Sequence, residues 1–503
     1  MSENGAAIVL TADRTLMSDY DLLFDAMIAC SQTTTTPRTI MDSLLLPRVR
    51  HTSGQADVAP LGLRRIQGAL RTSDFCDDDI AVVDDRHLRR AIGPDTRVIG
   101  VSTGEPLGMG MSSTTMTAIA GGRIYPAVLF EELMDALREI RDKNASGARI
   151  VVGGPGGWQL EDDAAARSDR GVDHLITGCA EGNIARIFRR LLSGEDVESV
   201  IEGEGCPAND MPPLSGPTVM GACEMSRGCG RGCSFCTLAD EPMRHVPPST
   251  IVKDVETNVE AGNENVTLLS EDLLRYGSDG GECNQVALME LLRDLRRMDS
   301  LNLIQADHAN VASIAEFSDA ELALVKRLLV GEQHDWASWL NIGVETASGR
   351  LMAENSCRAK MVGVEPDEWG EFAATQVRRL STAGFIPLVS LIIGLPGETD
   401  EDVAATLEWV QSLRTVPVCI FPVIFAPVKG ETRPEPERMS SGNWHLIAEC
   451  YEKNFRWVPR LYYEQQAAAE VSLARRAVMR ILGNTQACLW RRKFARHIRR
   501  AGQ

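Results

Sequence analysis

Apolar residues in the first two hundred positions fall into short runs separated by longer stretches with helical periodicity. Strand-like runs lie at 6–11, 80–83, 97–102, 149–154 and 174–178. Between them, Leu129, Leu133, Leu137 and Ile140 recur at i, i+4, i+8 and i+11, which is typical of an amphipathic helix. Short buried strands that alternate with such helices predict a doubly wound parallel sheet. We therefore expect a Rossmann-like α/β domain over residues 1–203.

The second half resumes this alternation after a segment rich in Pro and Gly at 204–219, which we interpret as a linker. Strands are expected at 220–226, 265–270, 301–306, 339–344, 386–393 and 417–425. Ser318–Glu321 and Thr399–Asp402 have the pattern of helix-capping boxes. Six repeats predict a partial (β/α)6 TIM-like barrel over 220–435, with working residues at the carboxyl ends of its strands. Residues 436–503 show only helical patterns and predict a small helical C-terminal domain.

The predicted strands of the first domain end in glycine-rich segments. These segments begin at Ser102, Gly153 and Gly178. None contains G-x-G-x-x-G, so a dinucleotide site is disfavoured. Glycines at three strand ends allow the backbone to approach a broad ligand, although simple tight turns remain an alternative.

The most specific chemical signal is Cys229-x3-Cys233-x2-Cys236. Three thiolates so close together can ligate three irons of a cubane cluster and leave the fourth iron open to a small molecule. Zinc is the alternative, but it usually needs a fourth Cys or His, and Cys223 and His245 lie at no familiar zinc spacing. The spacing therefore predicts a catalytic iron–sulfur site.

Composition and charge narrow the class of protein. Of the 503 residues, 44% are apolar, which suits a buried globular core, and no apolar run is long enough to span a bilayer. The N-terminus has no export signal, so we expect a cytoplasmic protein. The net charge of −18 argues against general nucleic-acid binding. Nine Lys/Arg and no acid follow Val471, and this basic tail predicts either packing on its own acidic chain or binding of a partner or RNA.

The segment 220–435 resembles the radical S-adenosylmethionine (SAM) enzymes, which carry the same cysteine spacing. The resemblance implies that Cys229, Cys233 and Cys236 hold a [4Fe-4S] cluster. It implies SAM contacts from these residues: Phe235, Ser270, Glu271, Asp272, Glu345, Ile392 and Gly394. Ser270-Glu-Asp stands where the family often has Gly-Gly-Glu, and Glu398 is displaced by one position from the family's glutamate, so no role is transferred to it.

The N-terminal half resembles the cobalamin-binding domain that precedes this barrel in one subgroup. The implied cobalamin contacts are Ser102, Thr103, Gly108, Gly153, Gly154, Pro155, Gly178 and Glu181. The cobalt-ligating signature Asp-x-His-x-x-Gly is absent. Asp85-Arg-His87 comes closest, but Arg90 stands in place of the glycine and the segment has a helical pattern, so we interpret His87 as a surface histidine.

The resemblance implies a cobalamin-dependent radical SAM methyltransferase. In that family the cluster cleaves SAM to a 5′-deoxyadenosyl radical, which takes hydrogen from an unactivated carbon, and methylcobalamin delivers the methyl group. Pro106-Leu-Gly-Met-Gly and Pro155-Gly-Gly-Trp look closest to an archaeal branch that methylates glutamine or arginine carbons of methyl-coenzyme M reductase. The expected partners are a protein or peptide substrate and an electron donor of ferredoxin or flavodoxin type; membrane and nucleic acid are not expected.

Three alternatives remain open at this point. A tRNA methylthiotransferase would use a similar barrel but needs three further N-terminal cysteines for a second cluster, and only Cys30, Cys76 and Cys179 precede residue 200. A cobalamin-dependent radical SAM enzyme that rearranges or cyclises a small metabolite shares every motif. A non-enzymatic iron–sulfur or zinc protein is the third.

Overall fold

The computed structural model describes residues 4–280, 282–331, 336–427 and 439–501. The chain divides into two compact units. The first unit comprises residues up to Thr117, Gly121–Cys223 and Ser249–Asn263, and the second comprises Ala118–Ala120, Glu224–Pro248 and the residues from Glu264 onward. Each unit is described by itself below. The predicted limit at 435/436 lies outside the described residues.

The first unit is built on a six-stranded parallel sheet with the order β4-β1-β5-β6-β7-β8. The strands are β1 (Ile8–Ala12), β4 (Ile80–Val82), β5 (Val98–Ser102), β6 (Arg149–Gly153), β7 (His174–Thr177) and β8 (Val200–Glu202). In register, Leu10 pairs with Val82 and Gly100, and Ser102 pairs with Gly153. The carboxyl ends of these strands therefore lie along one edge, as the sequence predicts.

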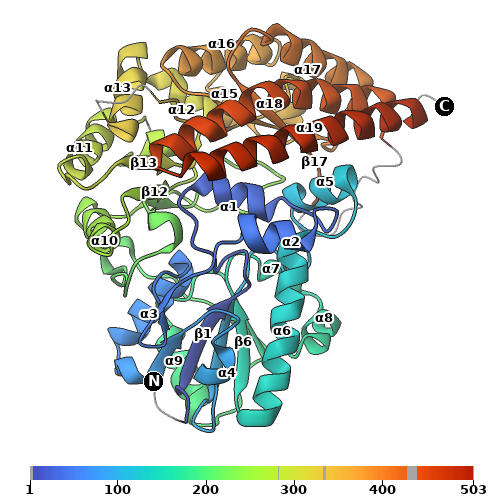
Figure 1. Ribbon diagram of the computed structural model, residues 1–503. Coiled ribbons are helices and arrows are strands. Elements are labelled where there is room, and N and C mark those ends of the chain that lie inside the picture. Colours follow the sequence, from blue (N-terminus) through green and yellow to red (C-terminus); the bar gives the residue numbers. More distant parts are fainter. Residues whose placement is uncertain (1–3, 281, 332–335, 428–438, 502–503) are drawn as a thin grey trace. The chain divides into compact units, whose positions relative to one another are not determined.

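Apolar runs form these strands because both faces of the sheet are covered. All five residues of β1 are buried, and α6 (Tyr125–Asn144) runs alongside the sheet (Figure 1). Its residues Leu129, Leu133, Leu137 and Ile140 are all buried, which confirms the predicted apolar face. The remaining helices of eight or more residues in this unit are α1 (Leu23–Cys30), α3 (Leu61–Arg71), α5 (Met111–Ala120), α9 (Ile184–Leu192) and α10 (Pro248–Glu260).

A buried ion pair joins two distant segments of the first unit. Arg65 on α3 contacts the carboxylate of Asp254 on α10, and both side chains are almost fully buried. Arg65 also donates a hydrogen bond of 2.5 Å to the carbonyl of Pro212. The two terminal nitrogens of the guanidinium thus bond to partners about 150 and 190 residues away in sequence, while its Nε has no hydrogen-bond partner among the described residues.

The second unit contains the strands of a partial barrel in chain order. They are β9 (Ala222–Glu224), which crosses from the first unit, and β12 (Asn265–Leu269), β13 (Leu303–Ala306), β14 (His308–Ala309), β15 (Asn341–Glu345), β16 (Leu388–Ile393) and β17 (Cys419–Ile424). They form the sheets β13-β12-β9 and β14-β15-β16-β17, which are interrupted at Asp307 between β13 and β14. Parallel neighbours in chain order confirm the predicted (β/α)-type arrangement.

Helices separate these strands. They are α11 (Gln285–Leu295), α12 (Val311–Glu316), α13 (Asp319–Val330), α14 (Gly349–Glu354), α15 (Arg358–Met361), α16 (Trp369–Thr382) and α17 (Asp400–Ser412). Both predicted capping boxes form, because the side chains of Ser318 and Thr399 accept the backbone N–H groups of Glu321 and Asp402.

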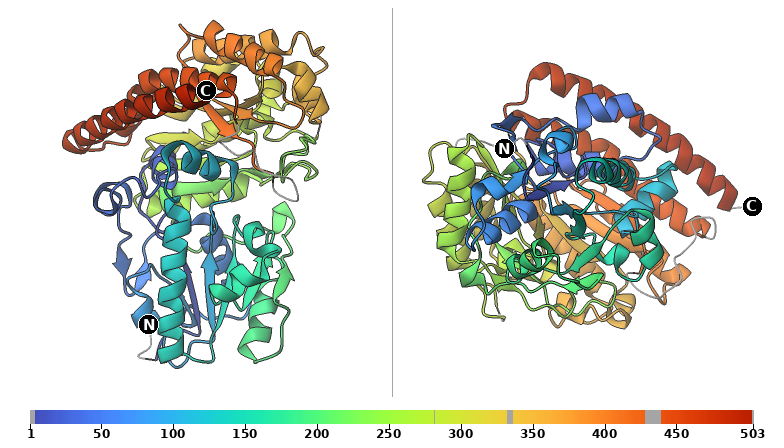
Figure 2. Two further views of the ribbon diagram at one scale, coloured as in Figure 1. Left: turned by 90° about the vertical axis from the view of Figure 1, so that its right-hand side faces the viewer. Right: turned by 90° about the horizontal axis from the view of Figure 1, so that it is seen from below.

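Two long helices complete the unit: α18 (Ser441–Ala468) and α19 (Leu473–Ala501) lie side by side (Figure 2). Tyr451 of α18 contacts Trp490 and Phe494 of α19, with ring centroids 4.9 Å apart in each case. The basic tail therefore packs on its own chain along this face. Among the described residues, no helix combines the length and apolar character that a membrane crossing requires.

Candidate functional site

The loop that carries the three cysteines is closed by backbone hydrogen bonds. Its flanks, β10 (Ser226–Arg227) and β11 (Arg244–His245), pair in antiparallel fashion. Inside the loop, the Cys229 N–H donates to the carbonyl of Glu241 at 2.9 Å, and the Gly232 N–H donates to Ala239 at 3.0 Å. The backbone of this segment is therefore held in a curled conformation by its own chain.

Glycine is required in this loop. Gly228, Gly230 and Gly232 have φ values of +83°, +68° and +75°, which residues with a side chain rarely adopt. A Cβ at Gly228 would also lie 2.5 Å from the carbonyl oxygen of Pro242. The curl thus depends on residues that lack a side chain.

The three cysteines are free thiols whose exposure differs: Cys233 is buried, Cys229 is half-buried and Cys236 is exposed. Burial raises the pKa of Cys229 and Cys236. A hydrogen bond with the fully buried thiol of Cys357 lowers the pKa of Cys233 to about 7, which favours its thiolate. Three free thiols on one loop, one already favoured as thiolate, are a donor set that fits an iron–sulfur cluster.

Residues after β12 anchor the cysteine loop. Asp272 is fully buried, and its Oδ2 accepts hydrogen bonds from Arg231 Nη2 at 3.1 Å and from Ser313 Oγ at 2.6 Å. Ser270 Oγ lies 2.5 Å from Ser226 Oγ at the edge of the loop. Glu271 between them is exposed. Of these three predicted SAM contacts, two side chains are engaged in the protein scaffold. The third, Glu271, has its pKa raised by burial of the carboxyl group, although the residue as a whole is exposed.

A buried ion pair lies at the end of β15. Glu345 is 6% exposed, has φ of +67° and follows a bulge in the β15–β16 pairing. Its Oε1 contacts Nζ of Lys360, a residue of α15 that is also buried. Burial alone would lower the pKa of Lys360, but the charges of Glu345 and Cys233 outweigh it and raise the pKa. A Cβ at Gly343 would lie 2.2 Å from Glu345 Oε1, so this glycine makes room for the pair.

The end of β16 supplies the remaining predicted SAM contacts. Ile392 is 4% exposed, and Gly394 has φ of +83°. The Gly394 N–H donates to Glu398 Oε2 at 3.0 Å, and Asn443 Nδ2 donates to the same oxygen at 3.1 Å. Burial raises the pKa of Glu398 to about 7. Glu398 thus fixes the turn after β16 and links it to α18.

The strand ends of the second unit therefore form one polar rim. Because neighbouring strands run parallel, the ends of β15 and β16 lie at the same edge, and β12 ends beside the cysteine loop. Lys360 and Cys357 were not identified from the sequence, because neither belongs to a motif whose spacing would link it to the polar rim. Phe235 is half-buried in the cysteine loop itself.

In the first unit, the predicted cobalamin contacts cluster at the carboxyl ends of β5 and β6. The Thr103 N–H donates to the carbonyl of Gly153 at 2.9 Å, and Gly154 has φ of +97°. A Cβ at Gly154 would lie 2.7 Å from Ser102 Oγ, so the close approach of these two strand ends requires glycine. Pro155 follows directly.

The other predicted contacts lie near this edge but further from its centre. Gly178, with φ of +71°, and Glu181 follow the neighbouring strand β7, while Gly108 lies in the loop after β5, with φ of +67°. This loop is held by Gln159, whose Oε1 accepts the Leu107 N–H at 2.9 Å. The loop is thus tied to the helix after β6.

A buried polar atom at this edge lacks a partner. Thr103 is fully buried, and its Oγ1 has no hydrogen bond within the part of the chain that the structure describes. A buried hydroxyl without a partner is unfavourable, and a bound polar ligand would satisfy it. Together with the glycine-lined edge, this hydroxyl fits a broad cofactor with polar substituents such as a corrinoid.

His87, which the sequence led us to interpret as a surface histidine, is partly exposed and has specific partners. Its side chain is 29% exposed, its Nδ1 lies 2.6 Å from Asp84 Oδ1, and its ring stacks on His51 with 3.6 Å between centroids. His87 directly precedes α4 (Leu88–Ala91), and its side chain makes no capping hydrogen bond to that helix. Asp84, not Asp85, is its carboxylate partner.

The three N-terminal cysteines lie in different places. Cys76 precedes β4 and therefore lies at the amino edge of the sheet, whereas Cys179 follows β7 at the carboxyl edge. Four strand spacings separate β4 from β7, which is about 19 Å. Cys30 ends α1. These thiols do not share one site.

Comparisons with known proteins agree with this geometry. A model of the Radical SAM superfamily matches residues 223–410. Two relatives are ribosomal protein uS12 methylthiotransferases RimO: that of Trichlorobacter lovleyi is 26% identical over 56% of this chain and 60% of its own, and that of Pelobacter propionicus is 27% identical over the same shares. The chain thus spans about 60% of the length of these relatives.

Solved structures of a radical SAM methyltransferase, TsrM from Kitasatospora setae, share the fold. The structure with cobalamin and a [4Fe-4S] cluster covers 83% of this chain and 75% of its own, with a TM-score of 0.52 and 15% identity. A second, with tryptophan and a SAM analogue, has a TM-score of 0.53 and 14% identity. The predicted fold class is confirmed by this likeness.

The family match falls on the cysteine loop and on the strands whose ends form the polar rim. It confirms the prediction of an enzyme domain that uses a [4Fe-4S] cluster and SAM. The match to the Radical SAM superfamily covers residues 223–410, which is less than half of the chain.

Proposed function

We propose that the chain is a cobalamin-dependent radical SAM methyltransferase that methylates an unactivated sp3 carbon. The observation that carries the proposal is the presence, in one chain, of a Cys-x3-Cys-x2-Cys loop and of a parallel sheet with a glycine-lined carboxyl edge. The fold likeness to a methyltransferase solved with cobalamin and a cluster supports this pairing.

The chain's own residues have distinct roles in this proposal. Cys229, Cys233 and Cys236 hold the cluster, which together with SAM supplies the radical chemistry when bound. The carboxylate of Glu271 would accept hydrogen bonds from the SAM ammonium, and Glu345, which Lys360 holds in place, would make a further polar contact. Phe235, Ile392 and Gly394 provide the apolar surface for the adenine.

The first unit holds the corrinoid in this proposal. Gly153 and Gly154 let the backbone at the ends of β5 and β6 approach a wide planar ligand, and Thr103 Oγ1 provides a hydroxyl that is available for a hydrogen bond. Pro155, Gly178 and Glu181 extend the same edge toward β7.

We propose a protein substrate, such as the glutamine or arginine side chain of methyl-coenzyme M reductase, and an electron donor of ferredoxin or flavodoxin type. The segments Pro106-Leu-Gly-Met-Gly and Pro155-Gly-Gly-Trp support this choice through their resemblance to the archaeal branch. Incubation with SAM, methylcobalamin, a reductant and peptides of that reductase tests it. A peptide heavier by one CH2 unit is expected, and its absence from all peptides contradicts the substrate.

The cofactor part of the proposal is tested by an absorbance spectrum of the anaerobically purified protein, with iron, sulfide and corrinoid assays. We expect one cluster per chain together with a bound corrinoid. A protein that binds a cluster but shows no saturable binding of cobalamin would contradict the proposal and leave the radical SAM domain intact. A rearrangement or cyclisation would give a product isomeric with its substrate instead of a mass gain.

A methylthiotransferase is the second candidate, because the curated relatives are enzymes of that name. Such enzymes need a second cluster in the N-terminal region. Cys76 and Cys179 lie at opposite edges of the sheet of the first unit, which disfavours a cluster shared between them. Iron for two clusters per chain would favour this candidate over ours.

A further inference from the structure

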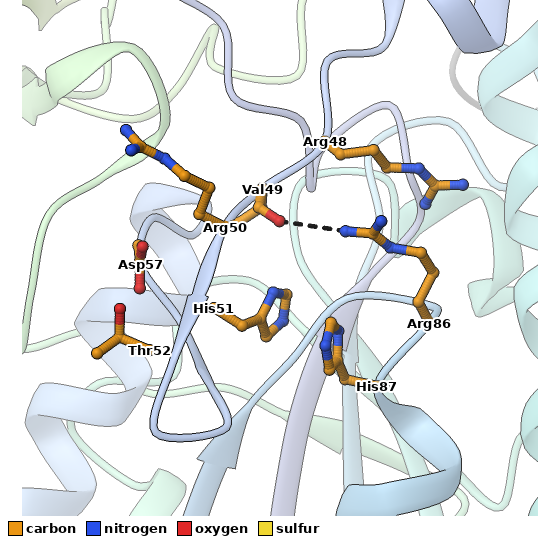
Figure 3. A pocket seen from close by; sticks show the side chains of 8 residues that line it. All are labelled: Arg48, Val49, Arg50, His51, Thr52, Asp57, Arg86 and His87. Atoms are coloured by element: carbon orange, nitrogen blue, oxygen red, sulfur yellow. Dashed lines mark hydrogen bonds between the residues drawn. The ribbon is translucent and has the colours of Figure 1, made fainter.

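A cavity in the first unit lies away from the glycine-lined edge of β5 and β6. It has a volume of about 570 Å³, and its lining includes Arg48, Arg50, Arg86, His51 and His87 (Figure 3). Arg86 and His87 follow the carboxyl end of β4, while His51 begins the short strand β2 (His51–Thr52). The proposed reaction assigns no role to these residues.

The carboxylate beneath this cavity is already saturated by donors. Asp84 is 2% exposed, and its oxygens accept from His87 Nδ1 at 2.6 Å, from Arg86 Nε at 3.1 Å and from the Arg86 backbone N–H at 3.2 Å. Asp84 therefore positions the arginine and the histidine. It does not remain available as a free acceptor in the cavity.

The remaining donors of the cavity are less fully engaged. Arg48 makes one hydrogen bond, of 2.6 Å, from Nη1 to Asp85 Oδ1. Arg50 is exposed and has no ion pair among the residues that the structure describes. The lining of the cavity thus has three arginines and one carboxylate, that of Asp57, with the side chains of Arg48 and Arg86 together on one side and that of Arg50 on the other (Figure 3).

A metal ion is the obvious alternative, because side-chain atoms of His51, Asp84 and His87 lie within 4.8 Å of one another. The two imidazoles, however, are stacked with only 21° between their planes, so their lone pairs do not converge on one point. A cation would also displace the donors that already occupy Asp84 and would face three guanidinium groups. This cluster is arranged for an anion.

We propose that this cavity binds the phosphate group of a small molecule. Guanidinium groups recognise phosphate through paired N–H donors, which the three arginines of the lining supply. The volume of about 570 Å³ leaves room for an organic portion beside the phosphate.

Two sources of such a phosphate have the same chemistry. One is a free phosphorylated metabolite. The other is the phosphodiester of a corrinoid, because β4 and β5 flank β1 and their carboxyl ends are about 10 Å apart. The second source rests on the proposed function, whereas the first does not.

The test is calorimetric titration of the anaerobically purified full chain with inorganic pyrophosphate, comparing wild type with R48Q and R50Q. Each substitution removes a charged donor while leaving Asp84 and its partners in place, and each is expected to weaken binding about tenfold. The matched control is R89Q, on the neighbouring helix, whose side chain is 61% exposed and pairs with Glu139. R89Q should bind as the wild type does.

Cobinamide, which lacks the phosphate, separates the two sources. If the corrinoid supplies the phosphate, R48Q and R50Q weaken cobalamin binding but not cobinamide binding. If a free metabolite supplies it, pyrophosphate binds equally to protein with and without cobalamin. Failure of cobalamin to bind would contradict the proposed function alone, since the pyrophosphate titration does not depend on it.

Three results would overturn the inference. One is the absence of saturable pyrophosphate binding by the wild type. Another is equal affinity in R48Q, R50Q and R89Q. The third is stoichiometric retention of Zn²⁺ that is lost in H87A, because it would assign the cluster to a cation.

Discussion

Replacing Lys360 with Met should strongly destabilise the second unit, because it leaves Glu345 buried without its partner. The side chains of the two residues are only 10% and 7% exposed. Removing one member of a buried ion pair typically costs about 3–5 kcal/mol, since the remaining charge is uncompensated. For a unit of this size, each kcal/mol lowers Tm by roughly 2–4 °C, so a loss of about 6–20 °C is expected.

The assay is thermal unfolding followed by circular dichroism on anaerobic samples of equal iron content. The double variant K360M/E345Q replaces the unpaired carboxylate with a neutral amide and should recover most of the lost Tm. A double-mutant cycle measures this recovery. If Glu345 also contacts SAM, the double variant regains stability while its SAM affinity stays reduced. K143M is the matched control, because Lys143 is 70% exposed and only 3.9 Å from Glu139 at the surface.

The reasoning would be refuted by a K360M variant whose Tm falls no further than that of K143M. It would also be refuted if the double variant were as unstable as the single one. Either result would show that Glu345 does not depend on Lys360 for its charge balance.

Three further predictions concern the cysteine loop, the glycine-lined edge of β5 and β6, and Glu398. Gly228→Ala should lower the iron content of the purified protein, because the new Cβ would lie 2.5 Å from the Pro242 carbonyl oxygen. Gly147→Ala is the control and should not change the iron content, because there is open space around that residue. Equal iron content in the two variants would contradict the need for glycine at 228. Thr103→Val should stabilise the corrinoid-free protein by about 1 kcal/mol and weaken cobalamin binding in an absorbance titration; unchanged affinity would show that the hydroxyl does not face the cofactor. Burial raises the pKa of Glu398 from 4.5 to about 7, so the native state holds this proton more tightly than the unfolded state does, and the free energy of unfolding should fall as the pH rises from about 4.5 to 7. Glu398→Gln should remove this fall. Parallel curves of Tm against pH for the variant and the wild type would contradict the prediction.

The strands and the cysteine loop were predictable because their signals are local. The expected strand 265–270 corresponds to β12 (Asn265–Leu269), and the expected 386–393 corresponds to β16 (Leu388–Ile393). A buried strand must be apolar along its length, and three ligands of one cluster must be close in sequence if they share a loop. Both requirements are visible in a short window of residues.

The partners of the charged residues were not predictable, since they depend on tertiary packing. Lys360 reaches Glu345 from a four-residue helix that has no periodicity of its own. His87 is held by Asp84 and stacks on His51, which is 36 positions away and belongs to a hairpin too short to give a strand signal. The position of the His87 ring therefore depends on neighbours that its own segment does not reveal.

The ion pair between Arg65 and Asp254 has a consequence for dividing the chain. Expression of the N-terminal half alone, truncated at the Pro- and Gly-rich segment before residue 220, would omit Asp254 and leave the buried Arg65 guanidinium without its carboxylate partner. Such a fragment should aggregate or be degraded, while the reciprocal fragment would carry α10 without the surface on which it packs. Production of either half as an independent protein thus requires transplanting 249–263 to the other polypeptide.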